Sequence, residues 1–244
     1  MPRAGASWGR FPKVAESEQA LLGVNDRVSP LPVFTGSVLP YGNGRSYGDS
    51  CLNPGGTLLC TRGLDRFIHF DADTGLLECE AGVTLSEILA LIVPRGWFLP
   101  VTPGTRFVTV GGAIANDVHG KNHAEAGSFG DHVIGIELLR SDGSRLTCSP
   151  DVNAALFQAT LGGLGLTGLV ISARLQLRSI QGVGLEVETR RFGQLADFFA
   201  LSRQTDVSEY RVAWVDCLAR GASLGRGVYS RAKHVPASSR EPRL

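Results

Sequence analysis

The sequence has 244 residues, of which 43% are hydrophobic and 19% charged, and this composition excludes an intrinsically disordered protein. Twenty-four Lys and Arg residues balance 23 Asp and Glu residues, so the chain lacks the basic excess typical of nucleic-acid binders. The 31 glycines fall in clusters without a fixed period, which excludes collagen-like chains and indicates places where the backbone bends sharply or approaches a ligand.

The first part of the chain predicts short strands after an irregular start rich in Pro and Gly. One helical stretch is expected at Glu16–Leu22, and a strand at Thr57–Thr61. Phe67–Phe70 and Leu76–Ala81 are apolar segments on either side of a turn, Asp71–Gly75, and this arrangement predicts a β-hairpin.

A helix is predicted directly after this hairpin. Thr84 and Glu87 have capping-box spacing, in which the Thr hydroxyl accepts from an early helix amide and the Glu carboxylate reaches back. Leu85, Ile88, Leu89 and Ile92 follow at helical spacing. The pattern therefore predicts a helix over 85–95.

The middle of the chain alternates between a glycine-rich segment and predicted β-structure. Residues 101–131 predict neither a strand nor a helix. Val133–Leu139 and Arg145–Cys148 predict a hairpin, and residues 150–160 predict a short helix. Apolar and polar residues alternate from Ile171 onward, which predicts a half-buried antiparallel strand.

Beyond residue 180 the pattern weakens. A helix is expected around Gln194–Ser202, with strand pieces at Tyr210–Val215 and Gly227–Ser230 that leave unpaired edges. The tail Pro236–Leu244 is polar, and we expect it to fray.

The cysteine pattern favours a reducing compartment, and the sequence shows no signal peptide or membrane span. The five Cys form no C-x-x-C pair and leave one residue unpaired, which argues against a disulfide framework. The first residues lack an apolar core of signal-peptide length, and no run approaches the roughly 18 apolar residues of a membrane span. We therefore expect a cytoplasmic protein.

The first glycine cluster, Tyr41–Asp49 (YGNGRSYGD), fits an anion. Closely spaced glycines let successive backbone N–H groups converge on a ligand, and Arg45 adds a guanidinium suited to a phosphate. The spacing is one residue too long for a Rossmann dinucleotide loop, and a hairpin follows in place of a helix. A plain surface loop is the alternative interpretation.

The second cluster runs from Pro103 to His123. Small residues at 111–115 would let a flat or charged ligand touch the backbone, and titratable groups follow at His119, Lys121 and His123. Asp117, His119, His123 and His132 could also ligate a metal. Lys121 lies between two of these imidazoles and Gly120 opposes a helix that would align them, so we expect no metal site.

Six motifs in order along the chain carry a resemblance to a known family: Gly44–Asp49, Pro103–Thr105, Thr109–Gly112, Asp117–His123, Gly127–Gly130 and Gly165–Gly168. Together they resemble the FAD-binding domain of the vanillyl-alcohol oxidase / p-cresol methylhydroxylase (PCMH) superfamily. Within it the chain is most similar to the decaprenylphosphoryl-β-D-ribose oxidase branch, and more distantly to alditol and sugar-lactone oxidases. The resemblance covers about residues 38–180.

The resemblance implies an α+β, PCMH-type FAD-binding fold at residues 1–180. Its two subdomains, about 1–100 and 101–180, would hold extended FAD between them, and residues 181–244 would form the start of a truncated substrate (cap) domain. The residues that the resemblance assigns to FAD are Pro40, Tyr41, Gly42, Asn43, Gly44, Arg45, Ser46, Tyr47, Gly48, Asp49, Ser50, Gly104, Thr109, Val110, Gly111, Gly112, Asn116, Asp117, Val118, His119 and Val170.

The resemblance also implies a reaction. FAD would be bound non-covalently, because Arg45 occupies the position at which many relatives carry a flavin-linked His. His119 and Lys121 match catalytic positions beside the flavin, where a hydride leaves an alcohol carbon of a sugar. The substrate would be a small or lipid-linked sugar, which allows peripheral contact with the inner face of the membrane. A partner chain or reductase would fit as electron acceptor, and nucleic acid would not bind.

The length of the chain leaves a second function class open. Family members run to roughly twice this length, and the polar end at residues 240–244 resembles a truncated end. The alternatives to a sugar oxidase are therefore a flavin-binding fragment without catalysis of its own, a sugar-lactone or alditol oxidase, and a metal-dependent hydrolase that uses the His cluster.

Overall fold

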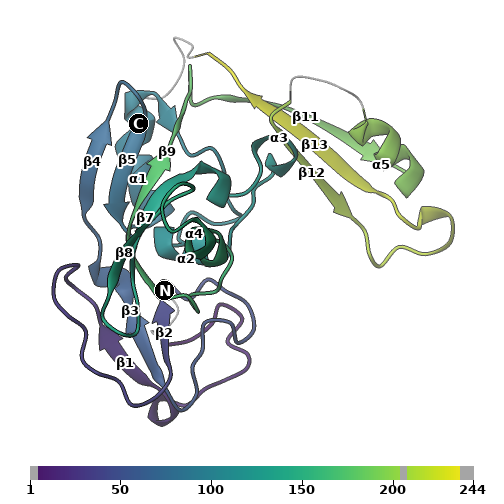
Figure 1. Cartoon of the computed structure of the whole chain (residues 1–244). Coiled ribbons are helices and arrows are strands. Elements are labelled where there is room, and N and C mark those ends of the chain that lie inside the picture. Colours follow the sequence, from purple (N-terminus) through teal and green to yellow (C-terminus); the bar gives the residue numbers. More distant parts are fainter. Residues whose placement is uncertain (1–4, 204–207, 237–244) are drawn as a thin grey trace.

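The computed structural model describes residues 5–203 and 208–236 and has an α+β fold (Figure 1). A parallel sheet of order β1-β3-β2 contains Ala20–Gly23 (β1), Val38–Tyr41 (β2) and Thr57–Cys60 (β3). A central antiparallel sheet of order β4-β5-β9-β7-β8 contains Phe67–Asp71 (β4), Leu76–Glu80 (β5), Val133–Leu139 (β7), Arg145–Cys148 (β8) and Leu169–Gln176 (β9). A C-terminal antiparallel sheet of order β11-β13-β12 contains Leu185–Phe192 (β11), Tyr210–Val215 (β12) and Gly227–His234 (β13).

Helices and one short strand pair complete the fold. Strand β6 pairs with β10 between the central and C-terminal sheets; the bounds are Trp97–Phe98 (β6) and Arg178–Ser179 (β10). The helices are Leu85–Ile92 (α1), Val110–Ala115 (α2), His123–Ala126 (α3), Ala154–Thr160 (α4) and Leu195–Ser202 (α5). The end of the predicted polar tail, residues 237–244, lies outside the described residues.

The helix expected at Glu16–Leu22 is wrong. A short 3₁₀ turn at Glu16–Glu18 leads into β1, which pairs in parallel with β3. Leu22 packs against a buried cluster that includes Leu59 of β3. Pairing with a strand far along the chain outweighs the weak local preference for a helix here.

The predicted capping box at α1 is confirmed. The Glu87 amide donates to Thr84 Oγ1 over 3.3 Å, and Thr84 N donates to the Glu87 carboxylate over 2.7 Å. Leu85, Ile88 and Ile92 are buried in the main core. The α-helix ends at Ile92 and continues as one 3₁₀ turn to Arg95, so the predicted helix over 85–95 is close to the observed one.

The antiparallel strand expected from Ile171 is confirmed as β9, and the predicted alternation holds at 173–176, whereas Ser172 departs from it. Residues 169–173 of β9 are all buried, including Ser172 at 5% exposure, because β5 and β7 flank β9 and side chains cover both of its faces. This sheet also joins strands from both sides of residue 100. The predicted subdomain division near that residue therefore does not separate two sheets, and the change of sheet falls between β3 and β4.

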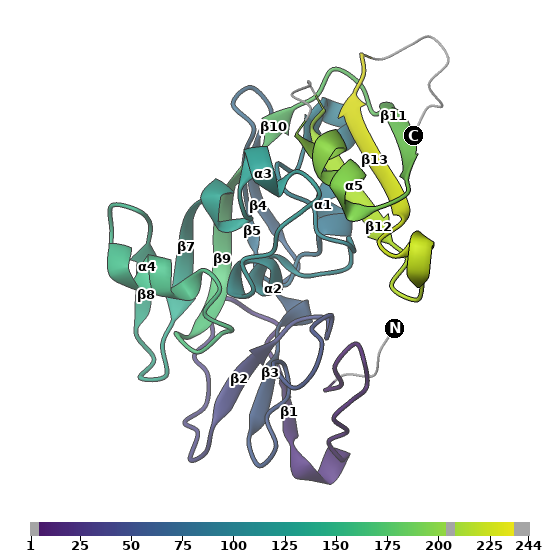
Figure 2. The same ribbon diagram turned by 90° about the vertical axis from the view of Figure 1, so that its right-hand side faces the viewer.

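The segment 101–131 contains two short helices that the sequence did not predict. The side chain of Thr109 caps α2 by accepting from Gly112 N over 3.1 Å, and Val110, Ala113 and Ile114 are buried in the main core. Gly111 lets α2 pack closely on β5 and the turn after it, since a Cβ on Gly111 would lie only 3.1 Å from Ala81 Cβ. Figure 2 shows α2 at the junction of the parallel and central sheets.

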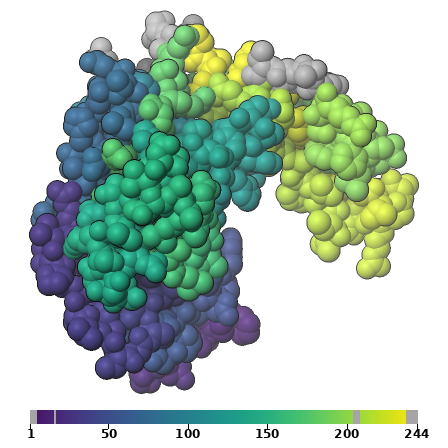
Figure 3. All heavy atoms as spheres, viewed as in Figure 1, coloured from purple at the N-terminus to yellow at the C-terminus, as the bar shows by residue number. Residues whose placement is uncertain are grey.

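The C-terminal sheet projects from the rest of the molecule (Figure 1) and leaves an open hollow beneath it in the space-filling view (Figure 3). Strand β13 lies between β11 and β12, so the edge expected at Gly227–Ser230 is paired on both sides. Strand β12 is an edge strand, as expected. Its Arg211 N donates to Lys121 O over 2.8 Å, which joins this sheet to the loop after α2.

Within residues 5–203 and 208–236, no helix combines the length and hydrophobicity required to cross a bilayer.

Candidate functional site

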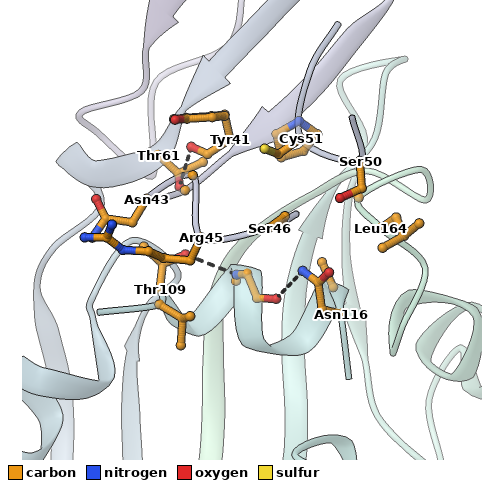
Figure 4. Close-up of a pocket in the computed structure, with 18 of the residues that line it drawn as sticks. Tyr41, Asn43, Arg45, Ser46, Ser50, Cys51, Thr61, Thr109, Asn116 and Leu164 are labelled. Atoms are coloured by element: carbon orange, nitrogen blue, oxygen red, sulfur yellow. Dashed lines mark hydrogen bonds between the residues drawn. The ribbon is translucent and has the colours of Figure 1, made fainter. Parts of the chain in front are cut away.

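A cavity of about 650 Å³ lies between the end of β2 and helix α2 (Figure 4). This volume is within the range of pockets that bind cofactors. Many residues assigned to FAD from the sequence line it: Pro40, Tyr41, Gly42, Asn43, Gly44, Arg45, Ser46, Tyr47, Ser50, Gly104, Thr109, Gly111, Gly112, Asn116, Val118 and Val170. The structure thus brings both glycine clusters and the start of β9 to one cavity.

The loop after β2, residues 42–47, forms one wall and is called the phosphate loop below. In the part of the chain that the structure describes, its backbone amides donate no hydrogen bond to protein. Gly44 has a φ of +59°, and any Cβ there would collide with Tyr41 Oη and Ala6 O. Such a run of free amides around a left-handed residue forms a concavity that binds anions.

Arg45 gives this wall its charge. Among the described lining residues it alone carries a formal charge, and it forms no hydrogen bond or ion pair with any described residue. Its Nε is buried without a partner. Burial raises the pKa of Tyr41 to about 12 and also raises the pKa of the Cys51 thiol, so both groups stay neutral at pH 7. The cavity therefore presents one uncompensated positive charge, which fits a diphosphate.

Replacing Arg45 with Ala is expected to weaken FAD binding without unfolding the domain. Loss of a charge-assisted phosphate contact costs about 1.5–3 kcal/mol, or roughly ten- to a hundredfold in affinity. Titration of the apoprotein with FAD measures the effect. Arg106→Ala is the matched control, because Arg106 stands 5.4 Å from the Phe107 ring yet does not line the cavity. Equal affinities of Arg45→Ala and the parent would contradict the role of Arg45.

Helix α2 forms the opposite wall, and its small residues allow a ligand to come close to the helix backbone. Its first amides are already used: Val110 N donates to Val83 O, Gly111 N to Ala81 O and Gly112 N to Thr109 Oγ1. Figure 4 shows Thr109 and Asn116 of this wall below the phosphate loop. Gly42 touches the wall so closely that a Cβ there would collide with Thr109 Oγ1. The phosphate loop, and not the helix, therefore supplies the free amide donors.

Some residues assigned to FAD from the sequence do not line this cavity. Gly48 and Asp49 are exposed beyond the phosphate loop, and Val110 is fully buried in the main core. Asp117 has a φ of +40° and its carboxylate accepts from Gly130 N over 2.8 Å, so it fixes the next loop. His119 is exposed and also lies outside the lining.

The two predicted catalytic residues stand on the loop that leaves the cavity at Val118. His119 forms an isolated bridge with Ser128, and its ring lies edge-on to His123 with centroids 5.7 Å apart. Lys121 is exposed, and its carbonyl holds β12 through Arg211 N. In the described ranges, no three His, Cys, Asp or Glu residues are arranged to hold a metal ion.

Other lining residues were not assigned from the sequence. Gly165 and Gly168 belong to a quoted motif and Ala115 to the small-residue track, so a signal for them was present. Trp8, Cys51 and Leu164 gave none, because each comes from an irregular segment whose contacts depend on the tertiary fold. The remaining residues of this group are Thr61, Ala81, Pro103, Thr105, Val108 and Leu169.

Comparison with known proteins relates the chain to FAD-binding proteins. The FAD binding domain family matches residues 34–149. Decaprenylphosphoryl-beta-D-ribose oxidase of Mycolicibacterium smegmatis is 40% identical over 199 residues, which cover 80% of this chain and 43% of that protein. Cytokinin dehydrogenase 4 of Arabidopsis thaliana is 30% identical over 155 residues, which cover 61% of this chain and 29% of that protein. The chain thus spans less than half the length of these relatives.

A solved structure has the same fold. Alkyldihydroxyacetonephosphate synthase superimposes with a TM-score of 0.68 at 13% identity, covering 82% of this chain and 42% of that one. At this identity the likeness concerns the fold alone. The family match and the relative at 40% identity agree with the six sequence motifs. The chain therefore belongs to the FAD-binding-domain family of the PCMH superfamily, and FAD is its cofactor.

Proposed function

We propose that the protein is an FAD-dependent oxidoreductase that oxidises an alcohol carbon of a sugar or of a polyprenyl-phosphate-linked sugar. The observation that carries this proposal is the cavity, in which free amides and one unpaired guanidinium face a wall of small residues. The relative at 40% identity is named as an oxidase of a decaprenylphosphoryl ribose, which supports the substrate class. FAD, when bound, accepts the hydride from that carbon.

Different residues are proposed to bind the cofactor and to cover the substrate. The phosphate-loop amides and Arg45 would bind the diphosphate, and Gly111, Gly112 and Ala115 would leave room for the rest of the cofactor. We assign this role to a unit of residues 1–180, and the role of covering the substrate to residues 181–244. The bond of Arg211 N to Lys121 O and the 2.7 Å ion pair of Arg211 with Glu125 support this, since both bring β12 to the loop of His119.

His119 and Lys121 are proposed to act on the substrate hydroxyl. Both side chains are exposed, next to the point where the chain leaves the cavity at Val118. Removal of the hydroxyl proton lets the carbon release its hydride, and an imidazole nitrogen can accept that proton. An ammonium at Lys121 would orient a hydroxyl or a phosphate of the substrate.

The flavin is expected to be released when the protein is denatured. The resemblance puts Arg45 of the phosphate loop at the position of a flavin-linked His, and a guanidinium does not form that bond. Acid precipitation followed by an absorption spectrum of both fractions is the measurement. We expect free FAD in the supernatant, and a yellow pellet would contradict non-covalent binding.

The substrate class is tested by anaerobic reduction of the flavin. The FAD-loaded protein is mixed with a polyprenyl-phosphate pentose, an alditol and a sugar lactone in turn, and bleaching of the flavin is followed. Fast bleaching by the lipid-linked pentose is the expected result. Bleaching only by the alditol or the lactone would favour those oxidase classes, and no bleaching by any of them would contradict the proposed activity.

A further inference from the structure

The segment Gly5–Gly9, which lies outside the matched family domain at 34–149, is tied to the phosphate loop. Tyr41 Oη donates to Ala6 O over 2.7 Å, and Trp8 N donates to Ser46 O over 2.9 Å. A third bond joins the buried Gln19 side chain to Gly5 O over 2.6 Å. The bond to Ser46 O joins the segment to the phosphate loop directly, and the other two hold it against the end of β2 and against Gln19.

Two aromatic rings enclose the Arg45 guanidinium. Its Cζ lies 4.8 Å from the centroid of Trp8 and 5.8 Å from that of Phe107, both within cation–π range. Both rings are anchored to the phosphate loop, Trp8 through Ser46 O and Phe107 through its carbonyl, which accepts from Asn43 Nδ2 over 2.8 Å. The backbones of Trp8 and Phe107 are thus held beside the loop, with both rings next to Arg45.

Arg45 contacts aromatic rings but has no acceptor for its N–H groups among the described residues. Its buried Nε is therefore unsatisfied. An unpaired buried donor costs free energy unless a ligand satisfies it. A side chain held by stacking, with its donors unused, is prepared for an anion that is not part of the protein.

We propose that Trp8 is a positioning residue of the cofactor site, which holds Arg45 in the orientation that meets the FAD diphosphate. The proposal rests on FAD occupying the cavity described above. Trp8 acts through Arg45, and the N-terminal segment is thereby part of the cofactor site.

The test is a double-mutant cycle of FAD affinity, with Trp8→Ala, Arg45→Ala and the double variant titrated as apoproteins. Trp8→Ala should weaken FAD binding by about three- to tenfold, the range of a partly buried cation–π contact. In the Arg45→Ala background the same change should have almost no effect, because the group that Trp8 positions is gone. Losses that multiply would show that Trp8 contacts FAD by itself and would overturn the proposal.

Two further variants of Trp8 distinguish the effect of an aromatic ring stacked on Arg45 from the effect of side-chain size. Trp8→Phe keeps an aromatic face and should bind FAD nearly as tightly as the parent, whereas Trp8→Leu should resemble Trp8→Ala. The matched control is Trp214→Ala, since Trp214 is an exposed Trp of β12 outside the cavity. Thermal unfolding of each apoprotein verifies folding, and unchanged midpoints are expected.

The outcomes distinguish this inference from the cofactor site itself. If Arg45→Ala weakens FAD binding and Trp8→Ala does not, only the positioning role fails. If neither variant changes the affinity, FAD does not meet this loop, and both the inference and the proposed cofactor site are contradicted.

Discussion

Replacing Gly112 with Val is expected to abolish FAD binding. Gly112 lines the cavity from the first turn of α2, and a Cβ built there meets only Thr109 Oγ1, at 3.0 Å. The rest of a branched side chain would therefore extend into the space that the cofactor needs. The backbone itself should tolerate the change, since Val is no worse than Gly in a helix. Visible absorption of the purified variant, and titration with added FAD, measure the loss.

The control for this variant is Gly36→Val. Gly36 has no atom within 4 Å of an added Cβ, requires no left-handed backbone and lies outside the cavity lining. We expect Gly36→Val to keep its flavin and Gly112→Val to be colourless, with both apoproteins unfolding cooperatively. Stoichiometric flavin in a folded Gly112→Val protein would show that this wall does not contact the cofactor.

His119→Ala is expected to lose turnover by far more than it loses flavin. The imidazole is exposed at the rim, outside the lining, so its removal leaves the cavity walls intact. Removal of a general base reduces the rate by about a hundred- to ten-thousandfold. Stopped-flow reduction of the flavin by substrate, measured on active protein, gives this rate directly.

A second His provides the comparison. His69 is exposed on β4, paired with Glu78 of β5 and outside the cavity lining, so His69→Ala should reduce flavin at the parent rate. Normal flavin reduction in His119→Ala would remove His119 from the chemistry. Loss of flavin in proportion to the loss of rate would instead assign it to cofactor binding.

The sequence predicted correctly those helices and strands that are determined by neighbouring residues in the chain. The capping box of Thr84 and Glu87, the β4–β5 hairpin and strand β7 all appear where their residue patterns place them. Strand β1 and helix α2 were missed because their stability comes from distant partners. Leu21 and Leu22 pair with β3, and the small residues of α2 pack on Ala81.

The same distinction applies to the cavity. Glycine spacing indicated a possible anion site at 41–49 and a close-approach track at 111–115, and the family resemblance then assigned both segments to FAD; both line the cavity. The contacts of Trp8 with Arg45 and of Asp117 with Gly130 depend on how separate segments meet. Neither contact has a local pattern, and both became visible only with the fold.

The most direct test of the cofactor assignment is the visible absorption spectrum of the purified protein, before and after addition of FAD. A cavity with free phosphate-loop amides and an unpaired Arg45 predicts flavin bands at one FAD per chain, either on purification or after reconstitution. A folded protein that remains colourless after addition of FAD and removal of the excess would contradict the account.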